Sequence, residues 1–364
     1  MLKKFLHPWK HRRPLKRPCV KVRVMSNVPA TQTKFSLSRP PRPMLSRDAD
    51  AIYWMSRYVE RAEHVARILW VNSNLLIDVG ELAPDLQLRQ WQSVIAIMRA
   101  GVLPEPPADD TGAEAVVAQR VAQHMVFNAD NPNSLFSCIS RARENARAVR
   151  ETISAEMWEN LNTLYWTLHD APARFDEAPD DFYRQVIYGS MLFQGLTDQT
   201  LAHDQRWHFA QLGKYLERID VTSRIIEIKF DILRAAEPKL EKPIKNIHWM
   251  GVLRSCCSIE AYRRNNVGDM DPLRVATFLI LEPDFPRSIR FAVKHAHDAI
   301  AAIRAELDPR GIDPAERTLG RLMAQLEYAE RTEITRSGVP QYLHKIQADV
   351  IDAALAIQKT YFLH

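Results

Sequence analysis

The spacing of the apolar residues is the feature that most restricts the fold of this chain. From Ser46 onward, apolar residues recur every three or four positions in almost every segment, which places them along one side of an α-helix. Prolines separate most of these segments, and no segment alternates apolar and polar residues as a strand would. The sequence therefore predicts an all-α fold, with helices at about 46–79, 86–100, 114–127, 133–152, 154–169, 181–200, 206–235, 246–265, 272–280, 287–307, 313–334 and 339–362.

A motif in the first long helix returns in the second, which indicates an internal repeat. Residues 58–69 and 215–226 share the pattern Tyr, aliphatic, Glu-Arg, any residue, acid, three residues, Arg and two aliphatics, 157 positions apart. Three further pairs recur at nearly the same offset: Trp91 and Trp249, Ser134 and Ser288, Phe182 and Tyr342. These matches predict a tandem duplication, with one copy at 44–200 and the other at 201–364, forming one bundle-like body.

Charged side chains of the repeated motif share one side of each long helix. Glu60, Glu63 and Arg67 are three, four and seven positions apart, so they lie within about 60° of one another around a helix. Their counterparts in the second copy are flanked by apolar residues on two sides, as in a central bundle helix. Arg61 and Arg218 point away from the clusters. The candidate cluster comprises Glu60, Arg61, Glu63, Arg67, Glu217, Arg218, Asp220 and Arg224.

Three interpretations of this cluster are open. Buried charges are costly unless they are paired and hydrogen-bonded, so we favour an Arg–carboxylate network that ties each long helix to its neighbours. The second interpretation is a functional site whose carboxylates and arginines hold an anionic or peptidic group. The third is a dimetal carboxylate site, but such bundles use Glu-x-x-His. His64 is one position off that spacing and the arginines would repel a cation, so we expect no metal.

A second candidate site lies where a helix is predicted to begin, at residues 284–288. Free backbone N–H groups, a hydroxyl and an arginine together suit an anion. Arg287 and Ser288 are therefore a candidate anion-binding pair. The plainer alternative is an ordinary capped helix start with a solvated arginine.

The composition argues against several common binding sites. Only 11 of the 364 residues are glycine, and the closest two, Gly189 and Gly195, are six positions apart. Dinucleotide-binding and P-loop motifs need glycines no more than about five positions apart, so we expect no such cofactor. The four cysteines form no Cys-x-x-Cys pair, which is typical of a cytoplasmic protein with reduced thiols. No uncharged run is long enough to span a bilayer.

The N-terminal region differs from the rest of the chain. Residues 1–45 hold twelve Lys and Arg, seven of the 22 prolines and no acid, so the remaining 37 basic residues (49 less 12) face 44 acidic ones. We expect residues 1–43 to be a disordered basic extension, with the folded chain and the natural start at Met44. Such a segment could bind nucleic acid or anionic lipid, but we expect neither a nucleic-acid nor a membrane partner.

The repeated motif and its surroundings resemble the bacterial Alpha-E family. The resemblance is carried by residues 44–63, which open the first long helix, and by residues 141–147, 157–162 and 285–288. It covers essentially 44–364, and family members resemble this chain from Met44 onward. The resemblance implies an α-helical fold, typically a tandem duplication with a Glu-Arg motif in each copy. Both copies of that motif are intact here.

The resemblance also implies a cellular context. The family's genes lie beside circularly permuted ATP-grasp amide ligases, a transglutaminase-like peptidase and an NTN-hydrolase-type peptidase, in a proposed peptide synthesis or modification system. By this resemblance the protein is a non-catalytic helical partner that docks to the ligase or presents its peptide or amino-acid substrate. The alternative is an enzyme of that system whose acid and base groups are Glu60, Glu63, Glu217 and Asp220, with the arginines binding substrate.

Overall fold

The computed structural model describes residues 44–362, except for 80–83, 102–112, 171–174, 176–177, 237–239, 267, 269, 308–310 and 312. The predicted extension at 1–43 lies outside the described residues. All described residues belong to one unit, Pro43–His364.

The described residues form fourteen α-helices and a terminal π-helical turn, with no strand among them, which confirms the predicted all-α class. The first half contains α1 (Ser46–Val79), α2 (Pro84–Met98), α3 (Ala113–Val126), α4 (Leu135–Ala148), α5 (Ala155–Asp170) and α6 (Pro179–Thr200). The second half contains α7 (Gln205–Ala236), α8 (Lys242–Ser255), α9 (Ile259–Asn265), α10 (Pro272–Leu281), α11 (Ile289–Leu307), α12 (Pro314–Glu327), α13 (Arg331–Ser337), α14 (Val339–Ile357) and the turn η4 (Gln358–Phe362).

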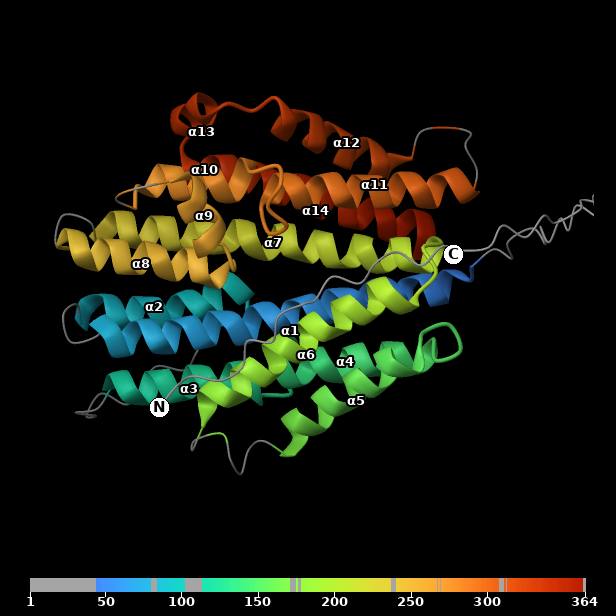
Figure 1. The fold of residues 1–364 in the computed structure, drawn as a ribbon, viewed down its shortest axis with the longest axis horizontal. Coiled ribbons are helices and arrows are strands. Elements are labelled where there is room, and N and C mark those ends of the chain that lie inside the picture. Colours follow the sequence, from blue (N-terminus) through green and yellow to red (C-terminus); the bar gives the residue numbers. More distant parts are fainter. Residues whose placement is uncertain are drawn as a thin grey trace, which may run out of the picture. The chain divides into compact units, whose positions relative to one another are not determined.

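The two long helices α1 and α7 pack side by side at the centre of the bundle (Figure 1). Helix α1 also packs against α4 and α6, and α7 packs against α11 and α14. The outer helices complete each side, with α5 against α4 and α6, and α12 against α11 and α14. The contacts of α1 thus have counterparts around α7, while the tandem duplication itself stays a prediction from the sequence.

Helix α7 is buried along most of its length, as its two apolar stripes predict. Leu212, Leu216 and Ile219 face one side, Val221 and Ile225 face another, and all five are fully buried. A helix with apolar residues on opposite sides must be covered on both. Any charged side chain in the same stretch is therefore forced into the protein interior.

The backbones of α1 and α7 approach very closely at one point, and a glycine makes this possible. A Cβ atom at Gly213 would lie 2.3 Å from the carbonyl oxygen of Tyr53 in α1. No real Cβ tolerates that distance, so any other residue there would push the helices apart. This close crossing lies one helical turn before the Glu-Arg motif of α7.

Two predicted helices are each divided into two in the structure. The segment predicted at 246–265 is α8 and α9, because the Ser258 hydroxyl and backbone N–H both bond to the carbonyl of Leu253 and end α8. Cys257 adopts a left-handed φ of 52° at this break, which no glycine signals in the sequence. The segment predicted at 313–334 is α12 and α13, separated at residues 328–330. In the part of the chain that the structure describes, no helix has the length and apolarity to cross a membrane.

Candidate functional site: two reciprocal Glu-Arg pairs

The two Glu-Arg motifs meet across the α1–α7 contact, and each arginine binds the glutamate of the other motif. Arg218 Nε and Nη2 donate to Glu60 Oε1 and Oε2 at 2.7 and 3.0 Å. Arg61 Nε and Nη2 donate to Glu217 Oε1 and Oε2 at 2.5 and 2.9 Å. Both are bidentate guanidinium–carboxylate pairs, the strongest and most directional kind of side-chain ion pair. We call Glu60–Arg218 and Glu217–Arg61 the reciprocal pairs.

Additional groups use the remaining hydrogen-bonding capacity of the reciprocal pairs. Arg57, one helical turn before Arg61, donates from Nε to Glu217 Oε2 at 2.9 Å. Arg61 Nη1 donates to Asn133 Oδ1 at 2.8 Å, just before α4. Arg218 Nη1 donates to the Pro286 carbonyl at 3.0 Å, just before α11. Arg61 and Arg218 therefore each connect three helices or helix starts, as their position on the central helices allows.

The second acid of each motif is bound by the arginine of its own helix, as the helical spacing predicts. Arg67 Nε donates to Glu63 Oε1 at 2.6 Å, and Arg224 Nη2 donates to Asp220 Oδ2 at 2.6 Å. Arg224 Nη1 also donates to the Ile97 carbonyl in the last turn of α2, where a helix leaves its carbonyls without intrahelical partners. All eight residues of the predicted cluster are thus paired with one another, in four ion pairs that we call the network.

The glutamates of the network are deeply buried and ionised. Burial alone would raise the pKa of Glu217, but Arg61 and Arg57 outweigh it and hold this pKa far below its ordinary value. For Glu60, burial is likewise outweighed by Arg218, the His64 contact and Arg287, so its pKa is well below normal. The pKa of Glu63 is also lowered, because Arg287 and Arg67 outweigh its burial.

The predicted anion-binding pair divides into two separate roles. The Ser288 hydroxyl accepts from the Phe291 backbone N–H at 3.1 Å and so caps α11. Arg287 is only 8% exposed, rather than solvated, and its Nη2 lies 2.9 Å from Glu63 Oε2. Its Nη1 lies 3.9 Å from Glu60 Oε1. The anions that Arg287 meets are therefore the chain's own carboxylates.

Three residues of α1 have the composition of a metal-ligand set. Glu60, Glu63 and His64 offer ligand atoms that lie within 4.8 Å of one another, and His64 Nε2 is 3.4 Å from Glu60 Oε1. His64 thus lies beside Glu60 in space although it is one position away from the Glu-x-x-His spacing of dimetal sites. Both carboxylates, however, are already bound by guanidinium groups, here Arg218 and Arg287. A cation would have to displace these permanent positive charges, so the donor set does not suit a metal.

Sequence reasoning missed a second buried polar cluster, formed by Lys229, Gln90 and His248. Lys229 Nζ donates to Gln90 Oε1, and Gln90 Nε2 lies 3.4 Å from His248 Nδ1. Burial lowers the pKa of Lys229 to about 7. Burial, together with Lys229, lowers the pKa of His248 to about 4. The available signal was the lysine itself, which stands among apolar residues in α7, a central helix that is buried along most of its length.

Comparison with known proteins identifies the family. A family model described as a predicted alpha-helical domain with a conserved ER motif matches residues 44–362. The chain belongs to the Alpha-E family. Both Glu-Arg dipeptides of the reciprocal pairs, at 60–61 and 217–218, lie inside the matched range.

The chain also matches relatives that are longer proteins. Uncharacterised proteins from Mycobacterium bovis and from Mycobacterium tuberculosis are 25% identical to this chain over 322 residues. The match covers 84% of this chain and 34% of each relative, so the chain spans about a third of their length. No solved structure matches the chain.

Proposed function

We propose that this Alpha-E protein is a non-catalytic helical partner in a bacterial peptide synthesis or modification system built around an ATP-grasp amide ligase. It docks to the ligase or presents the ligase's peptide or amino-acid substrate, in a system that also includes a transglutaminase-like peptidase. The class of partner comes from the family resemblance. The structural support is a surface suited to a protein partner.

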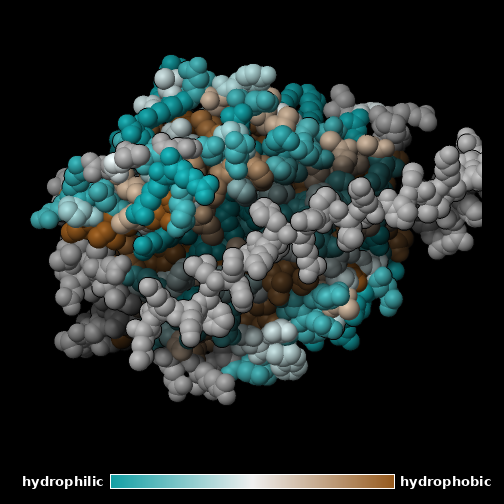
Figure 2. Space-filling model, viewed as in Figure 1, coloured by the Kyte–Doolittle hydropathy of each residue, from teal (hydrophilic) through white to brown (hydrophobic). Residues whose placement is uncertain are grey.

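The observation that carries the proposal is an exposed apolar face on α6. Tyr188, Met191 and Leu192 follow the i, i+3, i+4 spacing and so share one side of the helix. Their exposed fractions are 61%, 47% and 55%. Figure 2 shows hydrophobic residues gathered over α6 on this face of the molecule. Exposed apolar side chains that gather on one face often mark a site of protein interaction.

The longer relatives give independent support. In the two Mycobacterium proteins, the region that matches this chain accounts for 34% of the length, so about two thirds of each relative lies outside it. A helical domain that is joined to other sequence in its relatives is expected to work beside a further component.

The reciprocal pairs argue against the alternative of an acid–base enzyme. A general acid or base works best when its pKa lies near the operating pH. Here guanidinium groups hold the pKa values of Glu60, Glu63 and Glu217 below normal. Such carboxylates are weak bases and do not hold a proton at neutral pH. Their arginines are equally committed to the carboxylates, which leaves them poorly suited to bind substrate.

A native capture experiment tests the proposal. The full chain is tagged in its own host, purified at physiological salt, and the proteins that co-purify are identified and quantified by mass spectrometry. We expect stoichiometric recovery of an ATP-grasp or transglutaminase-type protein. We also expect Leu192→Asp to abolish the recovery, while Tyr328→Asp, a matched change at an 80% exposed residue of the second half, leaves it intact. Purification of the chain alone would contradict the proposal.

The same proposal predicts a cytoplasmic location, because ATP-dependent amide ligation requires cytoplasmic ATP. The three cysteines that the structure describes, Cys138, Cys256 and Cys257, are all free thiols. Free thiols persist in a reducing compartment, which agrees with that location. Fractionation of the host followed by immunoblotting tests it, and recovery of the protein in an extracytoplasmic fraction would contradict it.

A further inference from the structure

A groove of about 910 Å³ lies between α5 and the first turns of α6. Its volume is within the roughly 300–1,000 Å³ range of small-molecule sites. The two helices run antiparallel, since Thr200 Oγ1 at the end of α6 donates to Ser154 Oγ, just before α5, at 2.9 Å. The first turn of α6 therefore lies beside the last turn of α5. We call this feature the α5–α6 groove, and its wall includes Glu159, Trp166, Asp170, Asp181 and Phe182.

One stripe of α5 supplies the long wall of the groove. Glu159, Trp166 and Asp170 are seven and four positions apart, so they share one side of the helix. At about 1.5 Å per residue, the two acids are separated by about 16 Å along the helix axis, with the indole between them. Trp166 is 52% exposed, so much of its ring is open to a ligand. On the α6 side the buried ring of Phe182 forms an apolar floor, and Phe175 packs edge to face against it at 5.3 Å.

Every charged side chain of the described wall is acidic. These side chains are Glu159, Asp170 and Asp181. Across the ranges that the structure describes, the carboxylates of Glu159 and Asp181 bind no lysine, arginine or histidine. Asp170 Oδ1 lies 3.0 Å from His169 Nδ1, and its side chain is 74% exposed. The groove therefore offers negative charge at both of its ends.

The neutral polar groups of the wall are mostly bound within the chain. The hydroxyls of Thr163 and Thr167 each donate to a carbonyl one turn back in α5, at 2.9 Å. Asn162 Oδ1 accepts from Arg143 Nε at 2.7 Å, which also keeps this nearby arginine occupied. The wall therefore has few donors left for the carbonyls of a peptide. It is suited to recognise positive charge and apolar surface instead.

We propose that the α5–α6 groove binds a linear polyamine. One terminal ammonium pairs with Glu159, the other pairs with Asp170 and Asp181, and the chain between them lies along Trp166 and Phe182. A protonated amine is attracted to the face of an indole ring, and a wall of one charge sign selects a ligand of the opposite sign. Acids about 16 Å apart favour a long polyamine over a compact cation. The inference goes beyond the proposed function, and the exposed apolar face on α6 lies outside the wall.

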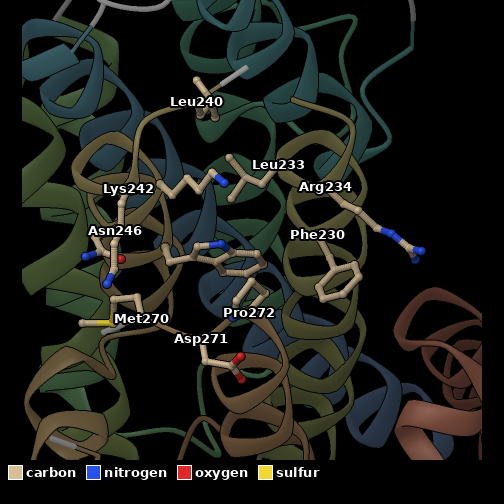
Figure 3. A pocket seen from close by; sticks show the side chains of 11 residues that line it. Phe230, Leu233, Arg234, Leu240, Lys242, Asn246, Met270, Asp271 and Pro272 are labelled. Atoms are coloured by element: carbon tan, nitrogen blue, oxygen red, sulfur yellow. The ribbon is translucent and has the colours of Figure 1, made fainter. Parts of the chain in front are cut away.

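A second cavity, of about 510 Å³, is formed by the end of α7, the start of α8 and the start of α10 (Figure 3). Its wall contains both basic and acidic residues, among them Arg234 and Asp271. Asp271 accepts from the Arg274 backbone N–H at 2.7 Å, and its carboxylate lies 3.3 Å from Arg331 Nη2. An acid balanced in this way does not select a polycation. The α5–α6 groove is therefore the expected site.

Isothermal titration calorimetry of the full chain with spermine tests the proposal at physiological ionic strength. Spermine should bind saturably at one site per chain. The double change Glu159→Gln with Asp181→Asn should weaken that binding about fivefold or more. Glu327→Gln, a matched change of an exposed acid at the end of α12, should alter it less than about twofold.

Two terminal diamines of equal charge, diaminobutane and diaminododecane, test whether the ligand reaches both ends of the groove. Only the longer diamine can span the two acids of α5, so it should bind about fivefold more tightly or better. The single change Glu159→Gln should remove most of this advantage. Trp166→Ala should weaken spermine binding about twofold or more, and circular dichroism would show that each variant keeps its helices.

Three results would overturn the proposal. The first is that spermine does not bind below about 1 mM. The second is that the double change at Glu159 and Asp181 leaves the affinity for spermine unchanged. The third is that amidated trilysine, a peptide of the same charge, binds more tightly than spermine, which would assign the groove to a basic peptide.

Discussion

Replacing Glu217 by glutamine should destabilise the fold far more than an ordinary substitution. Glutamine keeps the shape of the side chain but removes its charge. The change leaves the guanidinium groups of Arg57 and Arg61 without their shared counter-charge. Both arginines are largely buried, with side-chain exposures of 11% and 15%, and Glu217 is fully buried. Water therefore cannot replace the lost carboxylate.

The expected magnitude follows from the cost of an unpaired buried charge. Removing one partner of a buried ion pair typically costs about 3–5 kcal/mol. Exposed i, i+4 ion pairs on a helix contribute only about 0.3–0.5 kcal/mol. The chain offers a matched control in Lys294 and Asp298, which form an i, i+4 pair on α11 with side chains 59% and 51% exposed. Asp298→Asn should therefore cost about a tenth of what Glu217→Gln costs.

Chemical denaturation followed by circular dichroism measures these free energies of unfolding. A double-mutant cycle with Arg61→Gln isolates the pair, and the coupling energy between Glu217 and Arg61 should be about 1–3 kcal/mol. The reasoning would be refuted if Glu217→Gln cost no more than the Asp298→Asn control. Strict additivity of the two changes would refute it equally, because additive sites do not interact.

Three further predictions follow from the same structure. Gly213→Val should lower the midpoint temperature of thermal unfolding strongly and disturb the reciprocal pairs, because the valine Cβ would lie 2.3 Å from the Tyr53 carbonyl oxygen. A variant that unfolds at the same temperature as the wild type would contradict the close approach of α1 and α7. Because the pKa values of Glu60 and Glu217 are depressed in the folded protein, both residues add to the free energy of unfolding above their unfolded pKa of 4.5, and this contribution is lost as the pH falls below that value. A free energy of unfolding that stays constant down to about pH 3 would count against this prediction. Burial lowers the pKa of Lys229 to about 7, so burying this lysine reduces the free energy of unfolding most below pH 7 and least above the unfolded pKa of 10.5. Lys229→Met should therefore raise the free energy of unfolding, and by more near pH 6 than near pH 10. An equal effect at both pH values would be the contrary result.

The helices themselves could be predicted because their signal is local. Apolar residues at helical spacing identify nearly every helix, and the two apolar sides of α7 correctly indicate that its charges are buried. The exceptions are local breaks without a usual sequence marker. Cys257 takes a left-handed conformation with no glycine present, and the bonds from Ser258 to Leu253 that end α8 are visible only once the chain is folded.

The partners within the network could not be predicted, because they come from distant parts of the chain. A helical wheel places Glu63 and Arg67 together, and the structure confirms this pair. The wheel shows only that Arg61 points away from its own cluster. Its partner, Glu217, lies 156 positions further along the chain. That pairing depends on how α1 and α7 pack, which the apolar pattern of a single helix does not determine.

The same reasoning explains why Arg57 was missed. Its role requires Glu217 to lie opposite it, and nothing in α1 alone distinguishes it from a surface arginine. A signal was available in the repeat, since the position 157 residues later, Lys214, is also basic. A basic residue in both copies, one turn before the Glu-Arg motif, marks a position where positive charge recurs.

The central claim is that the reciprocal pairs hold α1 and α7 together as permanently ionised groups. Carbon-13 NMR of glutamate labelled at the side-chain carboxyl carbon tests it directly, by following each resonance as the pH is lowered. Resonances are assigned with Glu60→Gln and Glu217→Gln. The account predicts that both carboxylates remain ionised well below the ordinary glutamate pKa of 4.5, until the protein unfolds. A titration of either glutamate at or above that value in the folded protein would contradict it.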